Sequence, residues 1–381
     1  MATEKPLAGV RVLELARILA GPWCGQLLAD LGAEVIKVER PEVGDDTRTW
    51  GPPFVVDAKG EAWGSAYYHC CNRGKRSLAV DFESEDGRAT IRRLAGECEV
   101  VIENFKVGGL RKFGLDADSL RAAYPRLVYC SVSGFGQDGP YAERAGYDYI
   151  IQGMSGLMDI TGEAEREPQK VGVAVVDLFT GVYASTAILA ALRRRDRDGI
   201  GAHIDMALMD CAVAMLANQA MNYLVSGRSP TRLGNAHPNI APYQVFGVAD
   251  GHVIVAVGND RQFQSFCGAI GAEAAGAEPD FAANPLRVAN RARLVAELTP
   301  HLSAFTRAEL LSRLEAAGVP AGPINRIDAV FADPQVVHRG LRLDLVGDDG
   351  ARVSGVASPI VIDGVRMTSD HPSPRLGETA A

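Results

Sequence analysis

Residues 146–192 read GYDYIIQGMSGLMDITGEAEREPQKVGVAVVDLFTGVYASTAILAAL, and this stretch decides the fold. An apolar run over Val171–Val176 stops at Asp177, and small residues then recur through about Leu192. The pattern predicts a strand followed by a helix whose small side chains let another backbone or a ligand lie close. Because α/β sheets bind ligands beyond the carboxyl ends of their strands, we expect Asp177 at such a site.

Asp177 has two interpretations that are compatible with each other. An aspartate before a helix commonly caps it, because the carboxylate accepts hydrogen bonds from free N–H groups of the first turn. A carboxylate can also act as a nucleophile and form a covalent intermediate. Our central hypothesis is that Asp177 is a nucleophile that carries an acyl group.

The first forty residues predict a parallel sheet. Val10–Leu15 and Glu34–Glu39 are expected strands, and Trp23–Leu31, opened by Pro22, is the helix between them. Glu39 ends the second strand as the ribose-binding acid of a dinucleotide-binding unit would. The turn reads ARILAGPW, however, and lacks the G-x-G-x-x-G pattern, which argues against a nicotinamide cofactor.

Cationic loops accompany several of the expected strands. The turn Asn72–Ser77 precedes a strand over Leu78–Asp81, and Lys106 and Lys112 follow a strand over Glu99–Ile102. Because the strand-end loops of a doubly wound sheet meet on one edge, these clusters predict phosphate recognition there. The turn Asn72–Ser77 can equally be a solvated surface turn.

The chain changes character after Gly227. We expect a large Rossmann-like α/β domain over 1–226, ending in a helix over Met206–Leu224. A smaller α+β domain over 227–325 contains a hairpin of Val245–Val248 and His252–Val257. The segment 326–381 is expected to return to the large domain.

Composition narrows the class of protein. The net charge of −8 argues against nucleic acid as a general partner, although a local basic pocket for a small polyanion remains compatible with it. Seven cysteines without a C-x-x-C pair or zinc spacing predict neither a disulfide framework nor a metal site. The N-terminus has no signal pattern, and we see no apolar run of membrane-spanning length. We therefore expect a cytoplasmic enzyme that neither spans nor binds a membrane.

Ordered motifs along nearly the whole chain resemble the family III CoA-transferases, the group of formyl-CoA transferase and carnitine CoA-transferase. The matching segments are LAGPWCGQLLADLGAEVIKVERP, GDDTR, NRGKRSLAVDF, ENFKVGGLRKFGLD, LVYCSVSGFGQDGPYAERAGYDYIIQGMSGLMDITG, VGVAVVDLFTGVYASTAILAAL, GNAHPNIAPYQVF, AAGVPAGPIN and the closing LGE.

The resemblance implies an interlocked homodimer with coenzyme A as co-substrate and no metal. It places the family's nucleophile on Asp177, which forms an anhydride with the acyl group and then a thioester with CoA. The expected contacts to CoA are Leu19, Ala20, Arg40, Asn104, Phe105, Lys106 and Lys112, and the NRGKR turn adds Asn72, Lys75 and Arg76 as neighbours of the phosphates.

Two departures within the family bear on the reaction. The α-methylacyl-CoA racemases use a His in a G-H-D motif, whereas this chain has Tyr147 there, which favours transfer of CoA over proton transfer. The region Val257–Arg261 lacks the glycine run of formyl-CoA transferase. The motif GNAHPNIAPYQVF resembles the branch that handles dicarboxylates, with succinyl-CoA as an expected donor.

Five residues are candidates to contact or shield the acyl substrate. Asn235, His237 and Arg261 could bind a distal carboxylate, although His237 can equally be a structural loop histidine. Tyr147 and Gln152 are expected near the reacting groups. A nicotinamide dehydrogenase, a CoA thioester hydrolase and a non-catalytic CoA-binding protein are the weaker alternatives.

Overall fold

A computed structural model describes residues 4–57 and 59–379, which form two compact units. Unit 1 runs up to Leu157 and also contains Lys170–Arg228 and the residues from Pro334 onward, whereas unit 2 contains Met158–Gln169 and Ser229–Asp333. The division therefore differs from the expected borders at 227 and 326. The segment 158–169 groups with unit 2, where Arg232 donates to the carbonyl oxygen of Asp159.

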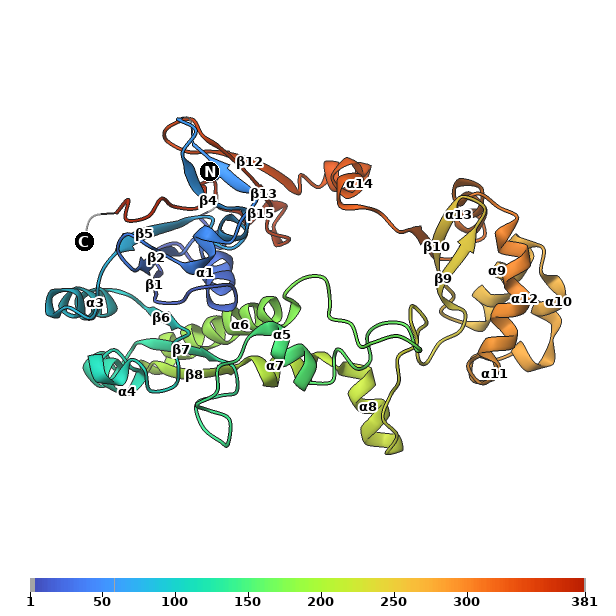
Figure 1. Cartoon of the computed structure of the whole chain (residues 1–381), viewed down its shortest axis with the longest axis horizontal. Helices are drawn as coiled ribbons and strands as arrows, with labels where there is room; N and C mark the ends of the chain where they lie inside the picture. Colours follow the sequence, from blue (N-terminus) through green and yellow to red (C-terminus); the bar gives the residue numbers. More distant parts are fainter. Residues whose placement is uncertain (1–3, 58, 380–381) are drawn as a thin grey trace. The chain divides into compact units, whose positions relative to one another are not determined.

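Unit 1 is built on a parallel sheet with the strand order β5-β2-β1-β6-β7-β8 (Figure 1). Every adjacent pair in it runs parallel, which confirms the predicted α/β class with a parallel sheet. The chain leaves β1 toward β2 on one side and later returns to β6 on the other. Loops at the carboxyl ends diverge at such a switch point and leave a crevice between them. The strands are β1 (Arg11–Glu14), β2 (Glu34–Glu39), β5 (Lys75–Ala79), β6 (Val100–Glu103), β7 (Val128–Ser133) and β8 (Ala202–Ala207).

The elements around this sheet include three short hairpins, β3-β4, β12-β13 and β14-β15, and several helices. The helices are α1 (Ala20–Asp30), α2 (Ala66–His69), α3 (Glu85–Glu97), α4 (Ala117–Ala123), α5 (Asp148–Met154), α6 (Val175–Asp198), α7 (Leu208–Met215), α8 (Ala217–Ser226) and α15 (Pro334–His338), and the 3₁₀ turns are Asp46–Thr49 and Arg111–Phe113. The further strands are β3 (Phe54–Val56), β4 (Ala62–Ser65), β12 (Arg342–Val346), β13 (Arg352–Val356), β14 (Val361–Ile362) and β15 (Val365–Arg366).

Two predictions about local structure are wrong. The run Val171–Val176 is not a strand: α6 already begins at Val175, so Asp177 lies in its first turn. The expected helix over Met206–Leu224 is the end of β8 followed by α7 and α8. The helix is interrupted at Leu216, and Ala217, the first residue of α8, has a φ of 42°, outside the right-handed helical region.

Helix α6 packs against α1 in the core of unit 1. Gly181 makes this contact possible, because a Cβ there would lie 2.7 Å from the carbonyl oxygen of Ala20. Helix α6 is long and apolar enough to cross a membrane. By length and composition alone, the expectation that the chain has no apolar run of membrane-spanning length is therefore wrong. Half of the most apolar window of α6 is buried, and buried core helices of soluble proteins meet the same criteria.

The NRGKR turn lies at the amino end of β5, away from the carboxyl edge of the sheet. Lys75 is fully buried, and its ammonium group lies 2.8 Å from Glu14 and donates to the Asn72 amide oxygen at 2.9 Å. Asn72 is fully buried as well. Arg76 points to the opposite face, where its exposed side chain pairs with Glu34 at 3.1 Å. Neither Asn72 nor Lys75 is free to contact a phosphate, so their expected role is corrected to a structural one, whereas the role of the exposed Arg76 stays a prediction.

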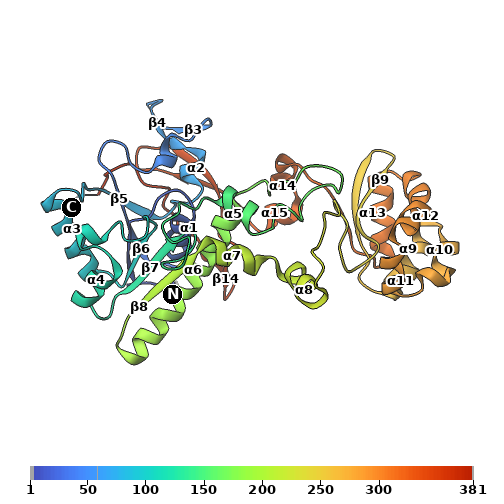
Figure 2. The same cartoon turned by 60° about the horizontal axis from the view of Figure 1, so that its bottom comes forward.

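Unit 2 has its own hydrophobic core between a small antiparallel sheet and a set of helices (Figure 2). The predicted hairpin is present as β9 (Tyr243–Val248) and β10 (Gly251–Ala256), and β11 (Ala321–Pro323) adds to β10. The helices are α9 (Asp260–Ile270), α10 (Glu273–Ala277), α11 (Asn284–Ala289), α12 (Arg291–Ser303), α13 (Arg307–Ala316) and α14 (Ile327–Ala332), and Pro279–Phe281 is a 3₁₀ turn.

Replacing Lys75 with Met should destabilise the protein strongly, because it leaves Glu14 buried with one counter-ion fewer. We expect a loss of about 3–5 kcal/mol in the free energy of unfolding, measured by urea denaturation. Arg76→Met is the matched control, and its exposed ion pair should be worth less than about 1 kcal/mol. Equal effects of the two substitutions would contradict the structural role of Lys75.

Candidate active site

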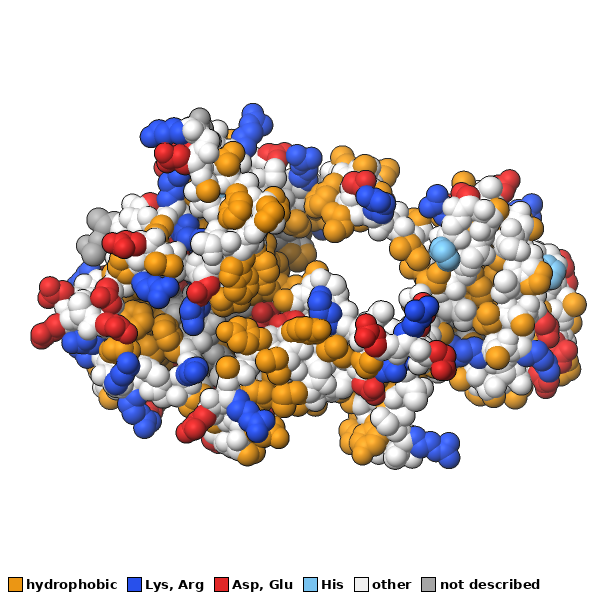
Figure 3. All heavy atoms as spheres, viewed as in Figure 1, with side chains coloured by type: hydrophobic (Ala, Val, Ile, Leu, Met, Phe, Trp, Pro, Cys, Tyr) orange, Lys and Arg blue, Asp and Glu red, His pale blue; other side chains and the backbone are white. Residues whose placement is uncertain are grey.

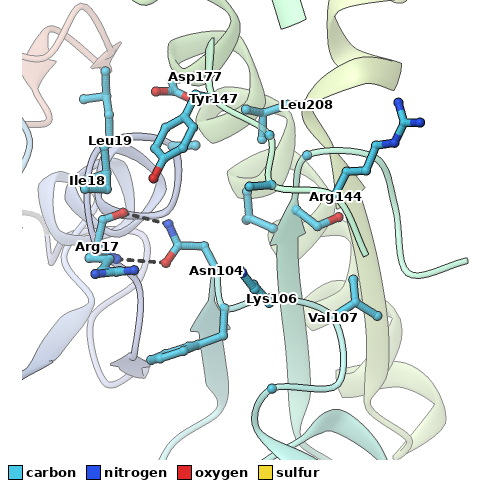
Figure 4. Close-up of a pocket in the computed structure, with 18 of the residues that line it drawn as sticks. Arg17, Ile18, Leu19, Asn104, Lys106, Val107, Arg144, Tyr147, Asp177 and Leu208 are labelled. Carbon is cyan, nitrogen blue, oxygen red and sulfur yellow. Dashed lines mark hydrogen bonds between the residues drawn. The ribbon is translucent and has the colours of Figure 1, made fainter. Parts of the chain in front are cut away.

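A cavity of about 400 Å³ lies at the switch point of the sheet (Figure 4). One wall is the segment Arg17–Ala20, which follows β1, and another is Asn104–Lys106, which follows β6. Tyr147 and Asp177 line it as well. The structure thus brings together Leu19, Ala20, Asn104, Phe105, Lys106, Tyr147 and Asp177, all of which were expected at the site.

Asp177 is the only aspartate among the described residues that line this cavity. Its side chain is 9% exposed, and burial raises its pKa to about 7, with the nearby charge of Asp148 adding to the shift. No cation contributes to that pKa among the described residues. A carboxylate that lacks a counter-ion and much of its water shell is poised to react as a nucleophile near neutral pH.

Asp148 explains how α6 can begin at this place. Ala174, at the N-cap position, has no side chain that could accept a hydrogen bond. Instead Asp148 on α5 reaches across, and its Oδ1 accepts from the N–H of Val176 at 2.8 Å and of Asp177 at 3.4 Å. The cap therefore comes from another helix and brings a second carboxylate beside Asp177.

Gln152 holds the capping carboxylate in place. Its side-chain nitrogen donates to Oδ2 of Asp148 at 2.7 Å, and its amide oxygen accepts from the N–H of Val171 at 2.9 Å. The side chain is fully buried and does not line the cavity. The expectation that Gln152 lies among the substrate contacts is thus corrected: it holds Asp148 and the Val171 backbone instead.

Two glycines set the distance between β7 and α5. A Cβ on Gly134 would lie 2.5 Å from Cα of Gly146, and a Cβ on Gly146 would lie 2.3 Å from Cα of Gly134. Real Cβ atoms do not approach this closely, so both backbones touch only because neither residue has a side chain. This contact places Tyr147 and Asp148 next to the first turn of α6.

A second cavity, of about 730 Å³, adjoins the first at the carboxyl edge of the sheet. The two cavities share three lining residues, Arg17, Phe105 and Gly109, and are therefore adjacent. Arg40 and Lys112 line the second cavity, as expected for residues near phosphates, together with Phe82 and Phe113. Phe82 packs edge-to-face on both Phe105 and Phe113.

The three candidates on unit 2 are described within that unit alone. Nδ1 of His237 accepts from the N–H of Asn239 at 3.1 Å, and its ring packs on Tyr243, which fits a structural loop histidine. Asn235 and Arg261 are exposed, and Arg261 lies in the first turn of α9. A role of these residues in substrate binding stays a prediction.

Comparison with known proteins identifies the family. Residues 7–380 match the family model described as CoA-transferase family III. The chain belongs to this family. Its sequence is 56% identical to the succinate–glutarate CoA-transferase of Agrobacterium fabrum, over 99% of this chain and 94% of that protein. It is 41% identical to the human succinyl-CoA:glutarate CoA-transferase, over 99% of this chain and 85% of that protein.

A crystal structure supports the same assignment for the fold. The CAIB/BAIF family protein from Brucella suis is similar with a TM-score of 0.87 and 57% sequence identity, covering 99% of this chain and 97% of that chain. The resemblance found in the motifs is thereby confirmed, and the protein is a CoA-transferase that acts on CoA thioesters. Within the described residues, no group of three His, Cys, Asp or Glu side chains could hold a metal ion.

Sequence reasoning missed three residues at the active site of this transferase. Asp148 and Arg17 lie within quoted motifs, but nothing in a sequence says that Asp148 caps a helix 27 residues further on. Burial raises the pKa of the Tyr67 hydroxyl, and the charges of Asp177 and Asp148 add to this effect. Tyr67 therefore lies near both carboxylates. Tyr67 and Tyr68 are adjacent in the sequence, and no pattern around them indicates that Tyr67 is the one near the active site.

Asp148→Asn tests how the second carboxylate tunes the transferase. Asparagine can still accept from the N–H of Val176, but it removes the negative charge that raises the pKa of Asp177. Asp177 must be ionised to attack, so the acidic limb of the rate profile should move to lower pH, by on the order of one unit. The measurement is the single-turnover rate of acyl transfer to the enzyme between pH 5 and 9.

Asp116→Asn is the matched control, since Asp116 caps α4 away from the cavity by accepting from the N–H of Ser119. Its acidic limb should coincide with that of the native enzyme. An unchanged or higher midpoint in Asp148→Asn would show that Asp148 does not set the pKa of the nucleophile.

Proposed function

We propose that this enzyme transfers CoA from succinyl-CoA to a dicarboxylic acid such as glutarate, with Asp177 as the covalent nucleophile. The observation that carries the proposal is a buried carboxylate without a counter-ion in a cavity at the switch point of the sheet. The relatives that are named as succinate–glutarate and succinyl-CoA:glutarate CoA-transferases support the choice of acids.

The first half of the reaction forms an anhydride on Asp177. A carboxylate oxygen of Asp177 attacks the thioester carbonyl, the C–S bond breaks, and CoA leaves as a thiolate, which is a good leaving group because thiols are far more acidic than alcohols. The thiolate then attacks the aspartyl carbonyl, and the donor acid leaves as its carboxylate. The enzyme now carries CoA as an aspartyl thioester.

The second half repeats these steps in reverse with the acceptor acid. The acceptor carboxylate attacks the aspartyl thioester, and the released thiolate attacks the acyl carbonyl of the new anhydride, which regenerates Asp177. Both intermediates would hydrolyse if water had free access. The low exposure of Asp177 supports a site in which the acceptor acid outcompetes water.

The second cavity suits the nucleotide end of CoA. Arg40 and Lys112 are exposed cations on its lining and can form charge-assisted hydrogen bonds with phosphate oxygens. Phe105 offers an aromatic face between this cavity and the one that contains Asp177. The pantetheine arm would then run past Phe105 and Lys106 to bring the thioester to Asp177. Asn235, His237 and Arg261 remain candidates for the distal carboxylate of the acyl group.

A second copy of the chain is the partner that we propose for unit 1, in the interlocked arrangement that the family resemblance implies. Apolar side chains on α6 and α8 support this, because Val182, Tyr183, Leu224 and Val225 are all more than 40% exposed. Figure 3 shows hydrophobic side chains at the surface on the face in view. Sedimentation analysis should give twice the mass of one chain, and a monomer would contradict the proposal.

The alternative reaction is exchange of the α-proton of an acyl-CoA, as in the racemases. Tyr147 occupies the position of the family's histidine, and its phenol is a poorer proton acceptor near neutral pH. Incubating the enzyme with an α-methylacyl-CoA in deuterated water without an acceptor acid distinguishes the two reactions. Deuterium incorporation at the α-carbon would favour the racemase.

Asp177→Ala should lower the rate of CoA transfer from succinyl-CoA to glutarate by on the order of 10³-fold or more, because no other carboxylate among the described lining residues can form the anhydride. Mass spectrometry of the native enzyme after mixing with succinyl-CoA should show an adduct on the peptide that contains Asp177. Transfer that survives the substitution, or an adduct on another residue, would refute the nucleophile.

Lys112→Ala and Arg40→Ala should each raise the KM for succinyl-CoA about tenfold with little change in kcat, since each removes one charge-assisted hydrogen bond to a phosphate. Arg93→Ala is the control, because this exposed arginine pairs with Glu97 on α3. An unchanged KM in both test variants would place the nucleotide elsewhere.

A further inference from the structure

The turn between β1 and α1 contains a strained residue at the wall of the thioester cavity. Ile18 has a φ of 72°, in the left-handed region. A β-branched residue rarely adopts this conformation, because its side chain collides with its own backbone. Ile18 lines the cavity together with Arg17 and Asp177. Strain of this kind persists only where surrounding groups hold the backbone firmly.

Asn104 holds one half of this turn with both ends of its amide. Its Oδ1 accepts from the N–H of Arg17 at 3.0 Å, and its Nδ2 donates to the carbonyl oxygen of the same residue at 2.7 Å. Figure 4 shows this pair of hydrogen bonds, with the Asn104 side chain directed at the Arg17 backbone. Asn104 comes from the end of β6, on the other side of the switch point.

Two further side chains hold the Ile18 half. Oδ1 of Asp45 accepts from the N–H of Ile18 at 3.3 Å, and the thiol of Cys71 lies 3.6 Å from its carbonyl oxygen. Asp45 is buried and pairs with Lys37 at 2.8 Å. Every backbone polar group of Arg17 and Ile18 thus has a side-chain partner from a different segment of the chain.

We propose that Asn104 is a positioning residue that clamps the strained Arg17–Ile18 turn against the cavity, rather than a side-chain contact to CoA. This inference rests on the proposed function only in placing the thioester in that cavity. The turn leads directly into Leu19 and Ala20, which line the cavity at the start of α1. If Ile18 relaxed to a negative φ, the chain would enter α1 in another direction and this wall would move.

A displaced wall has a specific chemical consequence. The covalent intermediates on Asp177 would sit in a cavity that admits water and aligns CoA poorly, so hydrolysis would rise relative to transfer. A general loss of stability would lower both rates together. The ratio of hydrolysis to transfer therefore separates a clamp from a residue that only stabilises the fold.

The experiment uses Asn104→Ala with two second substitutions at Ile18. Asn104→Ala should lower kcat/KM for transfer from succinyl-CoA to glutarate by about 10²-fold, the cost of a small misplacement, and raise the hydrolysis-to-transfer ratio. Adding Ile18→Gly should recover about tenfold, because glycine adopts a φ of 72° without strain and needs no clamp. Adding Ile18→Ala removes the branch but keeps the Cβ that disfavours this φ, and should recover clearly less activity than Gly.

Equal activity of the Gly and Ala double variants would overturn the proposal. The proposal would also be overturned if Asn104→Ala bound CoA more weakly, as measured by calorimetry, and left the hydrolysis-to-transfer ratio unchanged. That result is expected when a direct contact to CoA is lost. Asn290→Ala controls for loss of two backbone hydrogen bonds elsewhere, because Asn290 donates to Leu286 and Asp280 in unit 2. If Asn104→Ala does not fold, Asn104→Asp keeps the bond from the N–H of Arg17 and takes its place. Absence of transfer by the native enzyme would refute the proposed function instead.

Discussion

The hydrogen bonds from the first turn of α6 to the Asp148 carboxylate are the interaction on which the active site depends. They let a helix begin at Val175 without a capping side chain of its own, and they decide where Asp177 lies. The same bonds require α5 to lie close to α6, and the Gly134–Gly146 contact fixes the start of α5 against the end of β7. A structural device for starting a helix thereby also supplies the electrostatic environment of the nucleophile.

Opposing effects act on the Asp177 carboxylate at this position. The first turn of a helix favours an anion, because its free N–H groups and the helix dipole are positive there. Burial and the Asp148 charge act in the other direction and raise the pKa to about 7. A carboxylate with a raised pKa is more basic than an ordinary aspartate and still substantially ionised at neutral pH. The higher basicity favours attack on the thioester, and the partial ionisation keeps the attacking form present at neutral pH.

Much of the fold could be predicted from the sequence, because hydrophobic runs and turn residues identified most strands of the large sheet. The direction in which individual side chains point could not be predicted from the sequence. Lys75 and Arg76 are adjacent cations in one motif, and the alternation of side chains along β5 buries the first beside Glu14 and exposes the second. Asp177 was predicted at a strand end, whereas it begins a helix, because the cap comes from Asp148, far away in the sequence. The family was evident from ordered motifs, but the clamp on Ile18 depends on a backbone angle that no motif encodes.

The central claim is that Asp177 is a dehydrated carboxylate that titrates near neutral pH in the resting enzyme. It is tested most directly by ¹³C NMR of protein labelled at the aspartate carboxyl carbons, titrated in parallel with Asp177→Asn. The account predicts one carboxyl resonance that titrates with a pKa of about 7 and is missing from the variant. The account would be contradicted if the resonance that is missing from the variant titrated below about pH 5 in the native protein, as ordinary aspartates do.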